Sequence, residues 1–285
     1  MTSGVSDRGD LNAIGREAYI HDDDSAMTVR QHASRTAEKQ AGWFLPHLHA
    51  GMSLLDCGCA SGSITVGLAE ALAPGRVHGV DISEVEIGRA IARAEQQHID
   101  NIHFSVGNVY DLDFADNSFD AVFAHNVLEH IAEPGRALQE MKRVLQPGGV
   151  IGLRDFDIGG VIHAPESNLF QRFVDIYEAD WEQLGGHPRL ARQLPAYLAN
   201  AEFEDVIATA SFEAYSGAEV HTFMTEVLMG RLSEKAFVGR ITQGGMATLD
   251  EVDAIMDEFT AWRNLPGAFV GLAHVEVVAR KPHGR

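Results

Sequence analysis

Short apolar runs alternate with helical patterns at a regular interval between residues 53 and 155. The runs are rich in β-forming residues, and the segments between them place apolar residues three and four positions apart. The expected strands are SLLDC, RVHGVD, NIHFSVG, FDAVFAH and VIGLRDF, and the expected helices are GSITVGLAEALA, SEVEIGRAIARAEQQ and EPGRALQEMKRVL. This alternation predicts an α/β fold with a parallel sheet covered by helices on both faces.

Local signals mark two of the expected helix ends. Ser83 and Glu86 form the pattern of a capping box at the start of the second helix. The QPGG segment at 146–149 is expected to stop the third helix before the next strand.

The chain outside this block has a different character. Residues 25–48 predict an amphipathic helix that ends near Pro46, and 217–263 predict two or three helices. Further helices are expected in NLFQRFVDIYEADWEQL and RLARQLPAYLANA, and strands in FEDVIATASFEAY and AFVGLAHVEVVARKP. No internal repeat divides the chain. We therefore expect a flexible stretch at 1–24 and a single domain over 25–285, with a cap helix at 25–52, a core at 53–155 and a helical cover at 156–200 and 217–263.

Charge and composition narrow the classes of partner. The 41 acidic and 22 basic residues give a net charge of −19, which argues against a surface that binds nucleic acid or an anionic membrane. No apolar run approaches the ~18 residues of a membrane-spanning helix, and the polar start does not resemble an export signal. Two cysteines cannot form a disulfide framework, so a cytoplasmic location is expected.

The segment LLDCGCASGSIT, from Leu54 to Thr65, joins an expected strand to an expected helix. Gly58, Ala60 and Gly62 follow the acidic residue Asp56 at alternate positions. Residues without bulk allow a sharp turn and leave room for a ligand against the backbone. The following helix directs its first N–H groups and its positive dipole end toward that ligand, which favours a carboxylate or a phosphate.

The spacing of the small residues shows whether the turn is typical of a site for a dinucleotide or for another ligand. A dinucleotide fingerprint would place Ser63 at its sixth position, where serine fits poorly. The pattern Asp-x-Gly-x-Ala-x-Gly instead resembles motif I of the class I methyltransferases that use S-adenosylmethionine (SAM). The resemblance implies that Asp56 helps to hold the amino acid end of SAM. The turn residues that would contact SAM are Gly58, Cys59, Ala60 and Gly62.

Further segments match the same family in order along the chain. Asp81 ends the second expected strand within HGVDIS, where its carboxylate would accept both ribose hydroxyls, and Ile82 would pack against adenine. The segment VGNVYDLDF resembles the adenine clamp, with Val109 beside Asn108, which stands where aspartate is commoner. The segments FDAVFAHNVLEHI, LQPGG and VVARKP resemble the fourth strand, the turn before the fifth strand and the last strand.

The closest resemblance in detail is to the small-molecule branch that includes ubiquinone and menaquinone C-methyltransferases and secondary-metabolite methyltransferases, thiol methyltransferases among them. It implies a doubly wound, Rossmann-like sheet of seven strands with N-terminal and inserted helices as a lid. The stretch from Tyr19 to Leu48 resembles the cofactor-covering N-terminal helix of some members. In those members, residues at the positions of Tyr19 and Arg35 would face the SAM carboxylate.

Several residues allow both a chemical and a structural interpretation. Cys57 and Cys59 have no second ligand pair for zinc, so we interpret them as small buried residues. The acidic run at 21–24 is interpreted as solvated. Asp155 and Asp157 supply half of the carboxylate set used by metal-dependent catechol methyltransferases, and no metal is expected.

His125 and His130 follow the fourth expected strand. Histidine can accept a proton at neutral pH. The family often carries a packing histidine at the His130 position, so we interpret His130 as structural and His125 as a residue for cofactor positioning or catalysis.

These observations predict an enzyme that transfers the methyl group of SAM to the carbon, oxygen, sulfur or nitrogen atom of a small, apolar metabolite. Aromatic and methionine residues in NLFQRFVDIYEADW and HTFMTEVLMG would form core or line the acceptor. A homodimer remains open. One alternative is a SAM-binding regulator or cyclisation catalyst, because the motifs report binding and not chemistry. A nicotinamide-dependent oxidoreductase is a weaker alternative.

Overall fold

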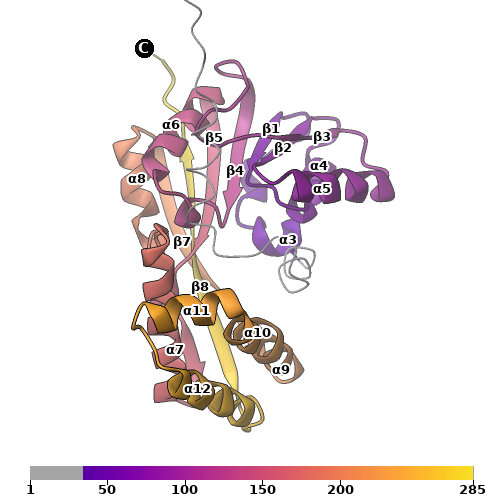
Figure 1. Ribbon diagram of the computed structural model, residues 1–285. Helices are drawn as coiled ribbons and strands as arrows, with labels where there is room; N and C mark the ends of the chain where they lie inside the picture. The colour runs from indigo at the N-terminus through magenta and orange to yellow at the C-terminus, as the bar shows by residue number, and fades with distance from the viewer. Residues whose placement is uncertain (1–34, 285) are drawn as a thin grey trace, which may run out of the picture.

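A computed structural model describes residues 35–284, and it shows an α/β fold built on one sheet of eight strands (Figure 1). The strands are β1 (Leu54–Cys57), β2 (Val77–Asp81), β3 (Ile102–Val106), β4 (Phe119–His125), β5 (Leu145–Phe156), β6 (Ile162–Ala164), β7 (Glu204–Ser216) and β8 (Phe269–Arg280). The α-helices are α3 (Ala37–Gln40), α4 (Ser63–Leu72), α5 (Glu84–Gln97), α6 (Pro134–Val144), α7 (Asn168–Gln183), α8 (Leu194–Asn200), α9 (Ala218–Phe223), α10 (Met229–Ser233), α11 (Lys235–Gln243) and α12 (Leu249–Trp262). The shorter turns are η1 (Leu45–His47), η2 (Leu128–His130), η3 (Ile158–Gly160), η4 (Ala191–Gln193) and the π-helix η5 (Met224–Leu228).

The sheet order is β3-β2-β1-β4-β5-β8-β6, and β7 also pairs with β8. Strands β1 to β5 are parallel, as predicted, whereas β8 runs antiparallel to β5, β6 and β7. The chain winds outward in both directions from β1 and β4. Ligands of open α/β sheets bind at such a reversal, beside the carboxyl ends of the strands.

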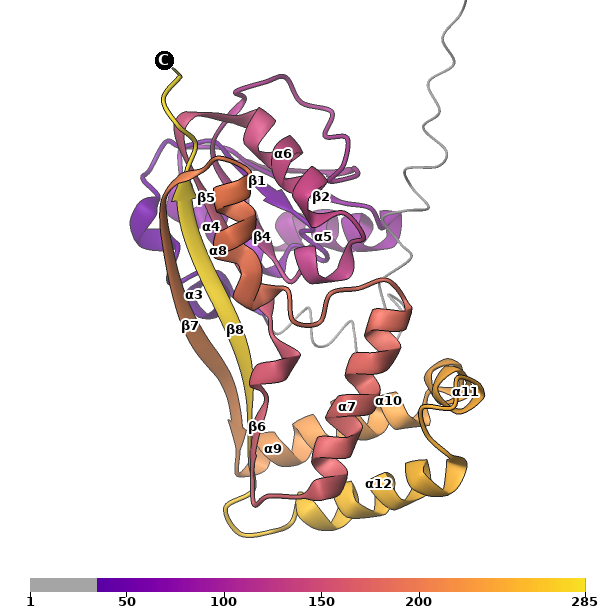
Figure 2. The same ribbon diagram turned by 90° about the vertical axis from the view of Figure 1, so that its left-hand side faces the viewer.

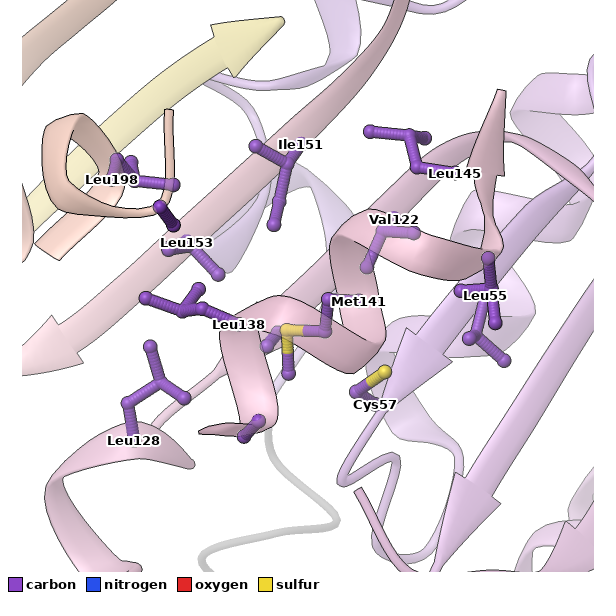
Figure 3. Close-up of a cluster of buried hydrophobic side chains, with 14 of the residues drawn as sticks. Leu55, Cys57, Val122, Leu128, Leu138, Met141, Leu145, Ile151, Leu153 and Leu198 are labelled. Atoms are coloured by element: carbon purple, nitrogen blue, oxygen red, sulfur yellow. The ribbon is translucent and has the colours of Figure 1, made fainter. Parts of the chain in front are cut away.

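Helices cover both faces of the parallel part of the sheet, as the sequence predicts. On one face, α6 and α8 pack against Leu55, Val122, Leu153 and their neighbours (Figure 3). On the other face, α3 and α4 enclose a second cluster with β1, β4 and β5. The strands are therefore apolar on both sides, which is typical of buried parallel strands.

The antiparallel strands extend beyond the parallel core. Figure 2 shows β7 and β8 running from the core toward α7, α9 and α12 at the opposite end. These helices enclose a third apolar cluster around Phe170, Phe259 and Trp262. Because β8 pairs with β5 in the core and also contributes Val270 to this cluster, one strand connects the two regions.

The prediction of a helix over 25–48 is wrong for the residues of this segment that the structure describes. Residues 25–34 lie outside the described part, α3 ends at Gln40, and Pro46 lies in η1. The chain leaves the helix so that Phe44 can stack on Phe123, with 5.6 Å between ring centroids. The burial of this aromatic pair outweighs the helical periodicity.

Other boundaries also differ from the prediction. The capping box is confirmed at Ser83, whose hydroxyl accepts the N–H of Glu86. The segment 146–149 follows α6 but belongs to β5 instead of a turn. Strand β6 was not predicted. Residues 217–263 form three helical stretches, within the predicted two or three: a continuous one over 218–233 that contains the π-helix η5, then α11 and α12. No helix between residues 35 and 284 is long and apolar enough to cross a bilayer.

Candidate active site

The turn after β1 has the geometry that its small residues predict. Gly58, Ala60 and Gly62 all have positive φ, at 73°, 44° and 70°. A Cβ added to Gly58 would lie 2.4 Å from Cγ2 of Val127, so the clash and the left-handed backbone both require glycine there. Ala60 tolerates a less extreme φ. The chain turns back over β1 and enters α4 with Gly62 at its N-cap.

Asp81 organises this turn from the neighbouring strand. Its Oδ2 accepts the N–H of Ala60 at 2.9 Å, and its Oδ1 accepts the N–H of Ser83 at 2.9 Å. One carboxylate therefore connects the first turn to the start of α5. Each carboxylate oxygen has a second lone pair that can accept a ligand hydroxyl. The adjacent Ile82 is half-buried.

Asp56 lies beneath the turn in a nearly closed environment. It is 3% exposed, and its Oδ2 accepts the hydroxyl of Thr65 at 2.7 Å. Burial raises the pKa of Asp56 to about 7, the Thr65 hydrogen bond opposes this, and repulsion from Asp81 adds to it. A cationic ligand group beside Asp56 would stabilise its charged form.

Asn108 and Val109 follow β3 at the same edge of the sheet. The Oδ1 of Asn108 accepts the N–H of Tyr110 at 2.9 Å, which closes a local turn. Asn108 is buried, whereas Val109 packs against the core cluster from a half-buried position.

The cysteines lie on different sides of the sheet. Cys57 belongs to the cluster under α6, whereas Cys59 packs among α4, α5 and β3. Burial raises the pKa of both thiols. The structure therefore supports the interpretation of small packing residues.

His125 ends β4 and contacts an arginine that the sequence analysis did not single out. Its Nε2 lies 2.7 Å from Nη1 of Arg154. Because a guanidinium only donates hydrogen bonds, Nε2 accepts and the ring proton resides on Nδ1. Burial and the nearby guanidinium groups hold the pKa of His125 well below its usual range. This geometry makes His125 a neutral hydrogen-bond donor and leaves its basic nitrogen occupied.

Arg154 also connects β5 to the antiparallel strands. Its Nε lies 3.3 Å from Oε1 of Glu276 on β8, and both side chains are almost fully buried. The hydroxyls of Thr209 and Ser211 on β7 donate to the same glutamate. Four strands thus share one polar network behind His125.

A cavity of about 150 Å³ lies beyond the carboxyl ends of β4 and β5. Aromatic and aliphatic side chains form most of its wall, among them Phe156, Phe170, Phe173, Tyr177, Trp181 and Phe223. Its polar wall includes Arg35, Asn126, Glu129 and His130. Of the residues predicted to bind SAM that the structure describes, Arg35 alone lines the cavity; Asp56, Asp81 and Asn108 do not. Phe170, Phe173, Tyr177, Trp181 and Phe223 lie in the two segments that the sequence analysis expected to form core or line the acceptor. Asn126, Glu129 and Phe156 come from other parts of the chain, and the sequence analysis did not single them out.

The remaining predicted residues fall into two groups. Tyr19 lies outside the described residues. Asp157 accepts two hydrogen bonds from Arg192, both at 2.6 Å, and Asp155 accepts the N–H of Val127 at 2.9 Å. Between residues 35 and 284, no three His, Cys, Asp or Glu side chains form a group that could hold a metal ion.

Comparison with known proteins gives the family. The methyltransferase domain family matches residues 48–215, more than half of the chain. The chain is 29% identical over 280 residues to a probable methyltransferase of Aspergillus luteorubrus, ltbC, with 90% of this chain and 95% of the relative covered. It is 36% identical over 187 residues to the 27-O-demethylrifamycin SV methyltransferase of Amycolatopsis mediterranei, with 61% and 68% covered.

A solved structure supports the fold. The (4+2)-cyclase SpnF matches with a TM-score of 0.55 and 22% identity, over 88% of this chain and 84% of that chain. This likeness concerns the fold alone. The turn after β1, the carboxylate that ends β2 and the family match agree with one another. The chain belongs to the class I methyltransferases and is an enzyme that takes its methyl group from S-adenosylmethionine.

Proposed function

We propose that SAM binds across the carboxyl ends of β1, β2 and β4 and gives its methyl group to a small, apolar acceptor in the adjoining cavity. The residues assigned to SAM are Arg35, Asp56, Gly58, Cys59, Ala60, Gly62, Asp81, Ile82, Asn108, Val109 and His125. Buried oxygen atoms that can accept hydrogen bonds fit SAM, which carries a positively charged ammonium group. Asp56 is nearly closed off, and Oδ1 of Asn126 is buried without a hydrogen-bond partner among the described residues.

Each part of this site has a separate role in holding the donor. Asp56 and Asn126 would accept hydrogen bonds from the ammonium group, and Arg35 would pair with the carboxylate. Asp81 would accept the ribose hydroxyls while it keeps the turn in place. His125 would act as a positioning residue, because Arg154 occupies its basic nitrogen.

The aromatic wall of the cavity is the observation that carries the acceptor assignment. The rings of Phe156 and Trp181 are nearly parallel, with 6.3 Å between their centroids. Apolar walls with a few polar groups at one end are typical of small-molecule sites. Since Arg35 and Asn126 border both the proposed donor site and the cavity, an acceptor there would lie next to the methyl group.

Bound SAM supplies a methyl carbon that its sulfonium already activates. The protein therefore aligns the two reactants and excludes water. To test the function, we would incubate the protein with methyl-labelled SAM and a panel of aromatic phenols, thiols, amines and quinols. We expect label in at least one apolar ring compound. Tight SAM binding without transfer to any member of the panel would contradict the proposal.

Asp56→Asn is expected to make the SAM-free protein more stable at neutral pH. The folded protein keeps a proton on Asp56 up to about pH 7, whereas the unfolded chain releases it near 3.8, so stability falls as pH rises through this window. Asparagine removes that loss, which amounts to about 2–4 kcal/mol. Denaturant unfolding at about pH 5 and pH 8 measures the difference.

The same substitution is expected to weaken SAM binding, because it removes the partner of the ammonium group. A wild-type protein and an Asp56→Asn variant with identical pH dependence of stability would show that Asp56 ionises normally and would contradict this account.

A further inference from the structure

We propose that Glu129 and Asp155 form a proton-sharing carboxyl pair that removes a proton from the acceptor, and that the acceptor is an aromatic alcohol or an enol. This inference rests on the proposed function, because it assigns a chemical class to the molecule in the same cavity.

The backbone holds the two carboxyl groups in a reciprocal arrangement. Glu129 lies in η2, and its Oε2 accepts the N–H of Phe156 at 2.8 Å. Asp155 lies in β5, and its Oδ1 accepts the N–H of Val127 at 2.9 Å. Each segment therefore fixes the carboxyl group of the other. Both side chains are 1% exposed, and Glu129 lines the cavity. The pair is rigid and protected from bulk water.

The contact between the two groups requires a proton. The N–H groups of Phe156 and Val127 hold the two carboxyl groups as buried neighbours. Ionised carboxylates only accept hydrogen bonds, so a hydrogen bond between these two groups needs a proton on one of them. Oδ2 of Asp155 receives no N–H or hydroxyl donor from the rest of the described chain. The pair must therefore carry at least one proton to be stable in this position.

The surrounding charges are compatible with a pair that holds one proton at neutral pH. Burial raises the pKa of Glu129 well above its ordinary value and that of Asp155 to about 6, and repulsion from Asp155 also raises the pKa of Glu129. Arg35 opposes the shift of Glu129, and Arg154 that of Asp155. Nε2 of His130 lies 3.6 Å from Oε1 of Glu129. The charged and titratable groups around the pair are Arg35, His130, Arg154 and, elsewhere in the cavity wall, Tyr177, Glu213, Arg231 and His274.

The proposed step conserves atoms and charge. The acceptor hydroxyl gives its proton to Glu129, and Glu129 passes its own proton to Asp155. The oxygen lone pair forms the new C–O bond, or for an enol the π electrons form a C–C bond, as the bond from sulfur to methyl breaks. The sulfonium becomes a neutral thioether, and the pair later releases one proton to water.

This chemistry selects among the acceptors that would fit an apolar cavity. A thioether or tertiary amine has no proton to lose, so the pair would give it no advantage. An aromatic hydroxyl is a poor nucleophile while it is protonated, and a base near neutral pKa promotes its ionisation. The ring would pack against the aromatic wall near Trp181.

Infrared difference spectroscopy tests the pair without any acceptor. The test is made in the Asp56→Asn background, which removes the other buried carboxyl group that holds a proton near neutral pH. Near pH 7, this protein is expected to show a protonated carboxyl band that is lost when either Glu129→Gln or Asp155→Asn is added. The matched control is Asp180→Asn, which changes another buried carboxylate that is paired with Arg240 outside the cavity wall. A spectrum in which neither variant of the pair changes the protonated carboxyl region would overturn the inference.

A kinetic test uses 2-naphthol and 1-nitro-2-naphthol, which share one scaffold. At about pH 8 the first is largely neutral and the second largely an anion. Glu129→Gln is expected to lower kcat for 2-naphthol by about 100- to 1000-fold but to change kcat for the nitro compound by less than about fivefold. Equal losses on both compounds would show a merely structural role and would overturn the inference.

A result that contradicts the proposed methyl transfer can be told apart from a result that contradicts the carboxyl pair. If the wild-type protein methylates neither naphthol nor any member of the acceptor panel, the proposed function is contradicted, while the infrared result still decides whether the pair shares a proton. In the Glu129→Gln variant, SAM affinity measured by calorimetry is expected to stay within about threefold of the wild type, since this residue lies in the acceptor wall.

Discussion

Asp81→Ala is expected to weaken SAM binding by about 100-fold or more. The substitution would remove the two hydrogen bonds that the ribose hydroxyls are proposed to donate to this carboxylate, each contributing about 1.5–3 kcal/mol. It also releases the N–H groups of Ala60 and Ser83, which hold the turn and the start of α5. Titration calorimetry with SAM measures the loss. Asp81→Asn keeps one oxygen and is expected to lose less.

Asp120 provides a matched control at the opposite end of the sheet. Its Oδ2 accepts the N–H and the hydroxyl of Ser53 at 2.8 and 2.7 Å, so it also holds backbone between neighbouring strands. Asp120→Ala is expected to lower stability without changing SAM affinity. Equal affinity losses in the Asp81 and Asp120 variants would mean that the effect is general destabilisation, and the ribose assignment would fail.

Arg154→Met is expected to lower the free energy of unfolding by about 3–5 kcal/mol, because it leaves the buried carboxylate of Glu276 without its cation. It also removes the donor that fixes the ring nitrogen of His125. Denaturant unfolding measures the stability loss, and nitrogen NMR of the histidine ring reports whether its proton leaves Nδ1.

The ion pair of Arg172 with Glu251 provides the comparison for Arg154. The distance is 2.8 Å, shorter than in the buried pair, but the side chains are 40% and 29% exposed. Arg172→Met is expected to cost about 1 kcal/mol or less, because water screens the charges. Similar costs for the two substitutions would contradict the role assigned to burial in the network behind His125.

Sequence patterns predicted the parallel core because its strands repeat a local rule. Each strand from β1 to β5 is a short apolar run between turn signals, and the pattern appears without knowledge of the partners. Strand β6 has three residues and pairs only with β8, so it has no periodicity of its own. Its existence depends on tertiary contacts.

The helices of residues 217–263 were predicted from their helical periodicity, but the π-helix η5 inside the first of them was not. A π-helix is a rare, single-turn bulge within an α-helix. Its residue Met224 belongs to the buried cluster that also holds Phe237 and Trp262. The sequence therefore predicts the helices there but not this bulge.

The proposed SAM site could be predicted from the sequence, whereas much of the acceptor cavity could not. Most of the residues proposed to bind SAM lie in short motifs at the end of a strand or directly after it, such as Asp56 to Gly62, so neighbouring positions fix their geometry. The cavity combines Glu129, Trp181 and Leu272 from segments far apart in the chain. Only the folded sheet brings Glu129 next to Asp155. The acceptor class consequently depended on the structure.

A crystal structure with S-adenosylhomocysteine tests the central claim most directly. The account predicts that the ribose lies on Asp81, that the amino group lies beside Asp56 and Asn126, and that the sulfur faces the cavity lined by Glu129. The ligand bound elsewhere, or bound with its sulfur turned away from that cavity, would contradict the account.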